Sequence, residues 1–421
     1  MAKKTINKEL TGAQDLYNFL FEACNIIRGP VSQDNFKDYI TPLLYYKRIS
    51  DVYDEETEEA LISSGGDKEY ASLPEQHRFV IPDGCHWQEV RERTENLGAA
   101  IVGAMRQIEI ANPDTLYGVL SMFSSQKWTN KAILNDSKIR DLIEHLSKRK
   151  LGNKDYPADL MGDAYEILLK KFADDSKAQA GEFYTPRSVV RLLVHILDPQ
   201  PGETVYDPAC GSGGMLIEAI RYMHDDSLCC GSIFGQEKNV VNAAIAKMNL
   251  FLHGASDFNV MQGDTLRDPK ILQGGNIAKF DCVIANPPFS LENWGATEWS
   301  SDKYKRNIYG TPSDSCGDYA WIQHMICSMS SGKGRMAVVM PQGILFRGNQ
   351  EAEIRKQLVE SDLIEAVVTL GDKLFYGTGL SPCFLIIRRM KPAHHSGRIL
   401  MIDGSKILTQ KRAQNILEEN D

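Results

Sequence analysis

From residue 203 onward, short apolar runs alternate with longer segments that carry apolar residues at helical spacing. Apolar runs of about four to eight residues are typical of buried strands, and stripes with a period near 3.6 are typical of helices. Regular alternation of the two predicts a parallel sheet covered by helices, because parallel strands need long crossover connections. The predicted strands are 203–207, 232–237, 258–262, 280–285, 335–340, 363–370, 382–389 and 398–403, and the predicted helices are 213–224, 239–253, 318–330 and 350–360.

The last three predicted strands follow one another without a helical stripe between them. Short connections join antiparallel strands but cannot join parallel ones. We therefore expect an α/β fold with a doubly wound, mostly parallel, Rossmann-like sheet that has an antiparallel edge.

The first 150 residues show helical stripes and no strand pattern, which predicts an N-terminal all-helical domain at 1–150. The acidic stretch 51–75 contains a Gly-Gly pair and is expected to be a partly solvated connector. The segment LGNKDYP at 151–157 predicts a boundary, so the α/β domain is expected at 151–421.

Composition excludes several classes of protein. No apolar run approaches the ~20 residues that span a bilayer, and the start MAKKTINKEL lacks the apolar core of a signal peptide, so we expect a cytoplasmic protein without membrane contact. The nine cysteines are scattered and never spaced CxxC, which argues against a disulfide framework or a zinc site, and no metal is expected. With a net charge of −9, binding to nucleic acid would require a local basic groove or a basic partner.

A glycine-rich turn, YDPACGSGG at 206–214, joins the first of these strands to the first helix. Glycines let the backbone pass close to a ligand, and the start of a helix offers free N–H groups. Gly211 and Gly213 are followed by Leu216, where a dinucleotide-binding fingerprint needs a third glycine. Asp207, at the mouth of the turn, would repel a pyrophosphate and attract a cationic group.

Acidic residues also follow the next two strands. Glu237 can accept hydrogen bonds from both hydroxyls of a ribose, and Asp264 can accept one from an adenine amino group. Together with Asp207, they suit a nucleoside with a positively charged tail, such as S-adenosyl-L-methionine, better than a nicotinamide dinucleotide.

The fourth predicted strand ends in Asn286-Pro287-Pro288-Phe289, beside the crevice where open α/β sheets bind ligands. Proline restricts its own backbone and that of the preceding residue, so the Asn286 side-chain oxygen and the Pro287 carbonyl would be held in place. Two such acceptors, aimed at the hydrogens of an adenine amine, would favour a localised nitrogen lone pair and stabilise the charge that develops on methylation. Phe289 would stack on a base that has left the double helix.

Three motifs resemble those of a known family. DPACGSGG, NPPFS and the upstream GEFYTPRSVVRLL at 181–193 resemble the modification subunits of type I restriction-modification systems, which are N6-adenine DNA methyltransferases. The resemblance covers nearly the whole chain, including LLYYKRISD at 43–51 and PQGILFRG at 341–348. It implies a site-specific enzyme that transfers a methyl group from S-adenosyl-L-methionine to N6 of adenine in double-stranded DNA.

The resemblance also implies residue roles. Residues 183–186 would pack on the methionine portion of the cofactor, Glu237 would bind its ribose and Asp264 its adenine. By local pattern alone, Thr185 and Pro186 also fit the start of a helix, with Thr185 as the cap. The catalytic residues would be Asn286, Pro287, Pro288 and Phe289, and the cofactor-binding residues would be Phe183, Tyr184, Thr185, Pro186, Asp207, Gly211, Ser212, Gly213, Glu237 and Asp264.

The segment 290–313, which follows the catalytic motif, interleaves aromatic and basic residues. Such a mixture is typical of loops that combine base stacking with phosphate contacts, and it also fits a surface loop that is anchored by a tryptophan. The residues expected to contact DNA are Trp294, Lys303, Lys305 and Arg306.

In this family, sequence recognition, methylation and cleavage are carried out by separate subunits. The resemblance implies a specificity subunit that reads the sequence, a restriction subunit with motor and nuclease activity, and a second copy of the modification subunit. This chain contains neither a repeat-built sequence reader nor a G-x-x-x-x-G-K-[ST] loop. Relatives continue into a C-terminal helical tail that contacts the specificity subunit, whereas the present sequence ends at Asp421, so this tail is expected to be missing.

Two other functions remain open from the residues. Some methyltransferases with an NPP-aromatic loop modify a protein glutamine or RNA, but the FYTP motif, the helical N-terminal region and the long segment after Phe289 count against them. A scaffold subunit that binds the cofactor without catalysis is disfavoured because Asn286 and Phe289 are both intact.

Overall fold

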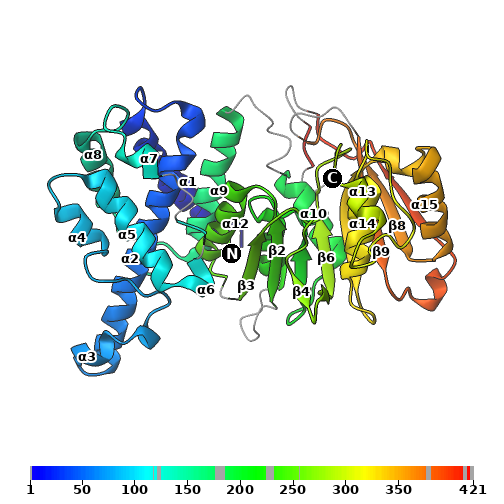
Figure 1. Cartoon of the computed structure of the whole chain (residues 1–421). Helices are drawn as coiled ribbons and strands as arrows, with labels where there is room; N and C mark the ends of the chain where they lie inside the picture. The colour runs from blue at the N-terminus through cyan, green and yellow to red at the C-terminus, as the bar shows by residue number, and fades with distance from the viewer. Residues whose placement is uncertain are drawn as a thin grey trace. The chain divides into compact units, whose positions relative to one another are not determined.

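The computed structural model describes residues 2–116, 118–120, 125–175, 185–223, 232–255, 257–375, 381–410 and 415–417. The chain forms two compact units (Figure 1). One consists of residues 1–178 with 251–254, and the other of residues 179–250 with 255–421. Within the described ranges, every helix is too short or too polar to cross a membrane.

The first unit is helical, as the sequence predicts. The apolar stripe of α1 is buried, with Leu16, Leu20 and Ile27 fully enclosed. Its long helices are α1 (Ala2–Ile27), α2 (Lys37–Ser63), α5 (Leu97–Ala111), α8 (Asp136–Leu146) and α9 (Ala158–Asp175), and its shorter ones are α3 (Lys68–Ala71), α4 (Trp87–Glu92), α6 (Pro113–Leu116) and α7 (Ser125–Thr129), with 3-10 turns at η1 (Gln33–Asn35) and η2 (Pro74–Gln76).

The expected connector at 51–75 is wrong in its first half, because α2 continues to Ser63. The Gly-Gly pair ends the helix instead: Gly65 and Gly66 have φ angles of +70° and +99°, which a residue with a side chain rarely adopts. Asp67 then caps the short helix α3 by accepting from the N–H of Glu69 at 2.9 Å.

Residues 151–156 are hydrogen-bonded to α2. Asp51 accepts from the N–H of Leu151 at 2.6 Å, and Arg48 donates to the carbonyl oxygen of Tyr156 at 2.9 Å. Both side chains are buried, so these bonds fix the segment to the helix. The compact helical unit therefore extends beyond the boundary expected at 150.

The second unit contains an eight-stranded sheet in the order β10-β8-β9-β7-β6-β1-β2-β3. All neighbouring pairs are parallel except those of β9, which runs antiparallel to both β7 and β8. The expected mostly parallel sheet with antiparallel pairing near one edge is thus confirmed. The strands are β1 (Val205–Asp207), β2 (Ile233–Glu237), β3 (Phe258–Gln262), β6 (Cys282–Ala285), β7 (Arg335–Pro341), β8 (Ile364–Leu370), β9 (Pro382–Arg388) and β10 (Leu400–Gly404), and a separate hairpin joins β4 (Leu272–Gln273) to β5 (Asn276–Ile277).

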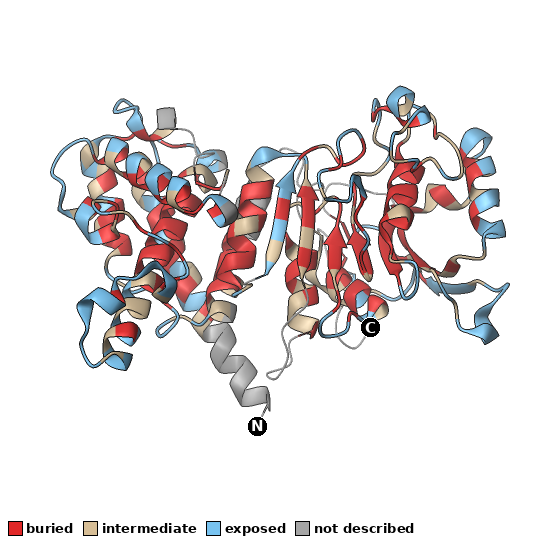
Figure 2. Cartoon of the chain, turned by 60° about the horizontal axis from the view of Figure 1, so that its bottom comes forward, coloured by how far each residue is buried: buried red, intermediate tan, exposed pale blue. Residues whose placement is uncertain are grey.

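Alternate residues of the central strands face two separate apolar cores. In β6, Cys282 and Ile284 belong to one core, and Val283 and Ala285 belong to the other. Both faces of the central strands are therefore buried, and Figure 2 shows the strands of the sheet as largely buried. The first core includes residues of α10 (Arg187–Leu197) and α11 (Gly214–Met223), and the second includes residues of α14 (Asp318–Ser328) and α15 (Asn349–Glu360). The unit also contains α13 (Ala296–Ser300), η4 (Gln342–Leu345) and η5 (Ala393–His395). Most of α12 (Val240–Leu252), up to Leu250, belongs to this unit as well.

The edge strand β10 is less protected than the others. Leu400, Met401 and Ile402 are 59%, 63% and 41% exposed, although they are apolar and consecutive. Within the described ranges they pair on one side only, with Ala366, Val367 and Val368 of β8.

Candidate active site

The strand order brings the two predicted motifs together. From β1 the chain moves outward to β2 and β3, and then returns to place β6 on the other side of β1. Tyr206 of β1 pairs with Val283 of β6, so the carboxyl ends of these two parallel strands are neighbours. A topological switch point of this kind opens a crevice at the ends of the strands, where α/β proteins bind ligands.

The glycine-rich turn leaves β1 at this crevice. Gly211 and Gly213 have φ angles of +52° and +85°, so their backbone conformations favour glycine. A Cβ added at Gly211 would meet no other atom within 4 Å, which means that open space lies beside this turn. The carbonyl oxygen of Ser212 accepts a hydrogen bond from Asn249 of α12 at 3.0 Å, and this bond fixes the turn from behind.

Two carboxylates, those of Asp207 and Glu237, lie beside the glycine-rich turn. Asp207 is only 2% exposed and accepts from the N–H of Ala209 at 2.9 Å. Burial raises the pKa of Asp207 to about 8, with a further increase from the nearby Glu237. Glu237 accepts from the N–H groups of Gly211 at 3.0 Å and Asn239 at 2.7 Å, and burial also raises its pKa.

No cation among the described residues contributes to the pKa of Asp207 or Glu237. Two partly desolvated carboxylates without a cationic partner are suited to a ligand that brings its own positive charge or hydroxyl donors. The residues present therefore fit S-adenosyl-L-methionine.

Asp264 follows β3 and forms a turn with its own neighbours. Its Oδ1 accepts from the N–H of Leu266 at 3.2 Å, and its Oδ2 is 2.8 Å from Nζ of the exposed Lys238. Thr265 donates its hydroxyl hydrogen to the carbonyl oxygen of Pro208 at 2.6 Å, which ties this turn to the glycine-rich turn. The structure thus brings together the strand ends that carry Asp207, Glu237 and Asp264.

The segment 286–290, called the NPPFS loop below, follows β6. The side-chain Nδ2 of Asn286 donates to Oγ1 of Thr185 at 2.9 Å. Its Oδ1 is buried and has no hydrogen-bond partner among the described residues. An unpaired buried acceptor is costly, so it marks a place where a ligand donor would be stabilised. Pro287 is buried, and the partly buried Phe289 packs at the edge of the core, 6.4 Å from the Phe375 ring centroid.

The FYTP motif is described only in its second half. Phe183 and Tyr184 lie outside the described residues, while Thr185 and Pro186 directly precede α10. Pro186 occupies the N-cap position without a side-chain cap bond, so the expectation that Thr185 caps the helix is wrong. Its hydroxyl contacts Asn286 instead, a pairing across 101 residues that no local pattern reveals.

Two of the four residues expected to contact DNA are buried, which corrects that expectation. Trp294 is 2% exposed and donates its indole N–H to the carbonyl oxygen of Ser313 at 2.8 Å. Arg306 is 1% exposed and its guanidinium pairs with Asp302 at 2.8 Å. Lys303 and Lys305 are exposed.

Arg306 links the segment 290–313 to the turn that follows β3. Its two terminal nitrogens donate to the carbonyl oxygens of Thr265 and Leu266 at 2.9 and 2.8 Å. It also lies 3.2 Å from Nδ1 of the buried His324, whose Nε2 is 3.2 Å from the hydroxyl of Tyr206 in β1. Sequence reasoning missed this network, although the i,i+4 spacing of Asp302 and Arg306 is a usual signal for an ion pair.

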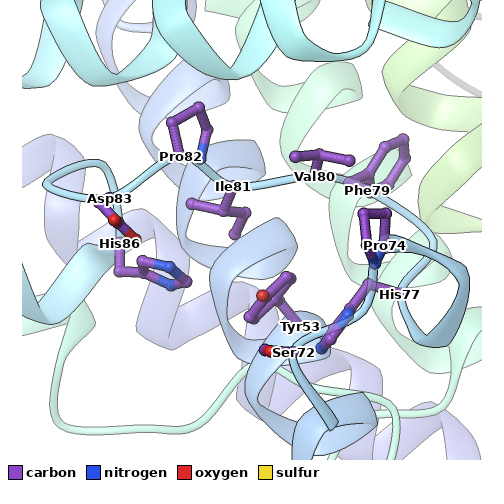
Figure 3. A pocket seen from close by; sticks show the side chains of 10 residues that line it. All are labelled: Tyr53, Ser72, Pro74, His77, Phe79, Val80, Ile81, Pro82, Asp83 and His86. Carbon is purple, nitrogen blue, oxygen red and sulfur yellow. The ribbon is translucent and has the colours of Figure 1, made fainter. Parts of the chain in front are cut away.

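A separate pocket of about 340 Å³ lies in the helical unit and contains none of the predicted site residues (Figure 3). Tyr53 stacks on His77 with ring centroids 3.8 Å apart, and His86 approaches the Tyr53 ring edge-on at 5.0 Å. These rings line the pocket together with Pro74, Pro82 and neighbouring residues.

Two family models match the chain. Residues 156–421 match the N-6 DNA methylase family, and residues 16–146 match the HsdM N-terminal domain. The chain belongs to the N-6 DNA methylase family. This family and fold imply S-adenosyl-L-methionine as the methyl donor. The two matches separate between 146 and 156, close to the boundary expected at 150, whereas the compact helical unit also includes α9.

Curated relatives are methylase subunits of type I restriction enzymes. The MjaVII subunit of Methanocaldococcus jannaschii is 34% identical over 400 residues, which are 90% of this chain and 66% of the relative. The EcoKI subunit of Escherichia coli is 27% identical over 385 residues, which are 87% of this chain and 65% of the relative. The chain thus spans about two thirds of the length of these two relatives.

A solved structure shows the same fold. The crystal structure of a type I restriction-modification methyltransferase subunit from Streptococcus thermophilus superimposes with a TM-score of 0.82 at 26% identity. The alignment covers 97% of this chain and 91% of that chain, so the likeness includes both the helical region and the sheet.

Proposed function

We propose that this chain is the modification subunit of a type I restriction-modification system and that it methylates N6 of adenine at a specific site in double-stranded DNA. When bound, S-adenosyl-L-methionine supplies a methyl group already activated on a sulfonium. The observation that carries the proposal is the buried Oδ1 of Asn286, which has no partner among the described residues and lies at the switch point beside Asp207.

Asn286 is proposed to accept a hydrogen bond from the target amine. Because Thr185 takes the Nδ2 side of the amide, the oxygen side remains for the substrate. The Pro287 carbonyl would be the second acceptor, and the two prolines keep both groups in place without reorganisation. Phe289 would stack on the extruded base, with Phe375 behind it.

The carboxylates are proposed to hold the cofactor. Asp207, with Gly211, Ser212 and Gly213 of the turn, would face its cationic methionine portion. Glu237 would take the ribose hydroxyls and Asp264 the adenine amine, in the order in which their strands lie in the sheet. Phe183, Tyr184, Thr185 and Pro186 are proposed to cover the methionine end.

The partners are proposed from what the curated relatives are. Those proteins are methylase subunits of type I restriction enzymes. We therefore expect double-stranded DNA, a specificity subunit, a restriction subunit and a second copy of this chain as partners, in the cytoplasm. Lys303 and Lys305 remain proposed DNA contacts because both are exposed.

The test compares acceptors in parallel. The full chain, produced with and without its specificity subunit, is incubated with methyl-tritiated S-adenosyl-L-methionine and with double-stranded DNA, RNA or a peptide release factor. Label should enter DNA alone, and nuclease digestion should recover it as N6-methyladenine. Label in RNA or in protein glutamine, with none in DNA, would replace the proposal by one of its rivals.

A further inference from the structure

A buried ionic cluster lies beside the exit of the NPPFS loop. Cys316, Asp318 and Glu351 bring a thiol and two carboxylates within 4.8 Å of one another, which is a spacing that a metal ion could use. The guanidinium of Arg347 already occupies this place. Its Nη1 lies 2.6 Å from Asp318 Oδ2 and 3.3 Å from Glu351 Oε1. The cluster therefore supplies its own cation.

The cluster is deep enough to hold one geometry. The side chains of Asp318 and Glu351 are 1% and 7% exposed. Charges at such depth need their partners, so the arrangement resists rearrangement. Gly343 in η4 leaves the space that the arginine needs, because a Cβ at this position would lie 2.5 Å from Arg347 Nε.

The cluster makes two bonds to Ser290, the last residue of the NPPFS loop. Asp318 Oδ1 accepts from the backbone N–H of Ser290 at 2.7 Å, and Arg347 Nη2 donates to its hydroxyl oxygen at 3.2 Å. Ser290 has a φ angle of +50°, a conformation that residues with side chains rarely adopt and that must be held from outside. The N–H of Gly317 also donates to the carbonyl oxygen of Leu291 at 3.0 Å.

The loop needs support at this end. Pro287 and Pro288 have no N–H, so the loop can be fixed only through its carbonyls, its side chains and the N–H groups that follow. Thr185 binds Asn286 at the entrance, and Asp318 binds the backbone of Ser290 at the exit. Phe289 lies between these two attachments.

We propose that Asp318 and Arg347 are positioning residues for methyl transfer: they fix the exit of the NPPFS loop, and with it the placement of Phe289 and Asn286 against the target base. The inference rests on the proposed function, and it adds residues that lie on α14 and just before α15. These residues touch the loop and not the cofactor carboxylates, so their loss should slow transfer without weakening cofactor binding.

The experiment uses the full chain assembled with its specificity subunit. Arg347→Lys keeps the charge but loses the planar fork that reaches Asp318 and Ser290 together. Ser290→Ala removes the hydroxyl contact and leaves the ion pairs intact. The matched control is Arg388→Lys, which changes the Arg388–Glu365 pair between β9 and β8 at 2.8 Å. Cofactor affinity, melting temperature and the single-turnover rate on DNA are measured for each variant.

We expect the single-turnover rate of Arg347→Lys to fall about 10- to 100-fold, because a displacement near 1 Å can cost this much. Its cofactor Kd should stay within about twofold of the parent value, and the control should match the parent in both. Ser290→Ala should lose a smaller part of the rate, about threefold or more, and it decides the question if Arg347→Lys unfolds.

If Arg347→Lys and Ser290→Ala both methylated DNA at the rate of the parent protein, the positioning role of Asp318 and Arg347 would be rejected. Loss of rate in strict proportion to loss of cofactor binding would also overturn it, since that would place the cluster on the cofactor side. Failure of the parent and of Arg388→Lys to methylate DNA would instead reject the proposed function.

Discussion

Asn286, the proposed catalytic residue, is hydrogen-bonded to Thr185 through its side-chain amide. A primary amide has a donor end and an acceptor end, and either can face a substrate. The hydroxyl of Thr185 pairs with the donor end, and among the residues that the structure describes the buried acceptor end has no partner. This arrangement leaves the acceptor end of the amide for a substrate that donates a hydrogen bond.

Replacing Asn286 with alanine should reduce methyl transfer about 10²- to 10³-fold, the usual loss for one preorganised polar group aimed at developing charge. Cofactor affinity should change less than about twofold, because Asn286 is proposed to contact the target amine and not the cofactor. Transfer is measured by single-turnover labelling of DNA and affinity by calorimetry.

The matched control is Asn276→Ala, which makes the same change in the exposed hairpin β4–β5. If Asn286→Ala stayed folded but no longer bound cofactor, Asn286 would belong to the cofactor pocket.

Asp207 should make cofactor affinity depend on pH. Its pKa is raised to about 8, so the carboxyl is largely protonated at pH 6.5 and ionised at pH 9. A positively charged cofactor binds the ionised form better, so affinity should rise by up to tenfold per pH unit below about pH 8 and then level off. Calorimetric titration from pH 6 to 9 measures this slope.

In Asp207→Asn the rise should flatten and affinity at pH 9 should fall. Asp314→Asn, a change at an exposed carboxylate, should keep the parent slope. An equal slope in Asp207→Asn and the parent would show that another group titrates.

At the scale of elements, the segment 290–313 is part of the scaffold. Trp294 and Trp299 pack at 5.6 Å in the second core, and Arg306 lies over the Trp299 ring at 4.5 Å. The sequence could not separate this arrangement from a DNA-binding loop, because both use aromatic and basic residues. Burial decides between them, and burial depends on partners such as Thr265 and Leu266 that lie far away in sequence.

Replacing Arg306 with glutamine should destabilise the fold by about 3–5 kcal/mol, because it leaves Asp302 buried without its cation. In a unit of this size the melting temperature should drop by roughly 10 °C. Calorimetric melting measures it, with Arg388→Gln, a change at a partly exposed arginine, as the control. An unchanged melting temperature together with weaker DNA binding would restore the DNA role of Arg306.

Lys303 and Lys305 should contribute to DNA binding through charge alone. Their replacement by glutamine should reduce the slope of log K against log salt by up to about 1.8, or about 0.9 for each phosphate that is no longer neutralised. Anisotropy titrations of the assembled complex at several salt concentrations give the slope. The same change at the exposed Lys356 and Lys406 should leave the salt slope unaltered. If the slope stayed unaltered for Lys303 and Lys305 as well, those two residues would not be part of the DNA interface.

The sequence predicts elements well where a single period dominates. The strands of the eight-stranded sheet lie within or close to their predicted ranges, because each of them reads as a short apolar run. It predicts less where the interacting residues are distant in sequence. The continuation of α2 to Ser63, the Thr185–Asn286 bond and the cluster around Arg347 all depend on which segments meet in space.

At the scale of the whole molecule, charge limits what the chain can do alone. With a net charge of −9, it lacks the basic excess that usually supplies affinity for the DNA backbone. At about 150 mM salt the chain by itself should bind a DNA duplex no more tightly than about 10⁻⁶ M. Adding the specificity subunit should tighten binding at least about 100-fold.

Anisotropy measures both affinities, and a scrambled duplex is the control for sequence preference. Tight, sequence-selective binding by the chain alone would contradict the proposed division of labour.

The exposed edge strand β10 should affect the solubility of the protein at high concentration. Among the residues that the structure describes, Leu400, Met401 and Ile402 are exposed and their strand is paired on one side only, and such an edge strand is a template for edge-to-edge aggregation. Concentrated stocks are therefore expected to turn cloudy on storage. A lysine at Met401 should delay this without disturbing the chemistry at the ends of the inner strands.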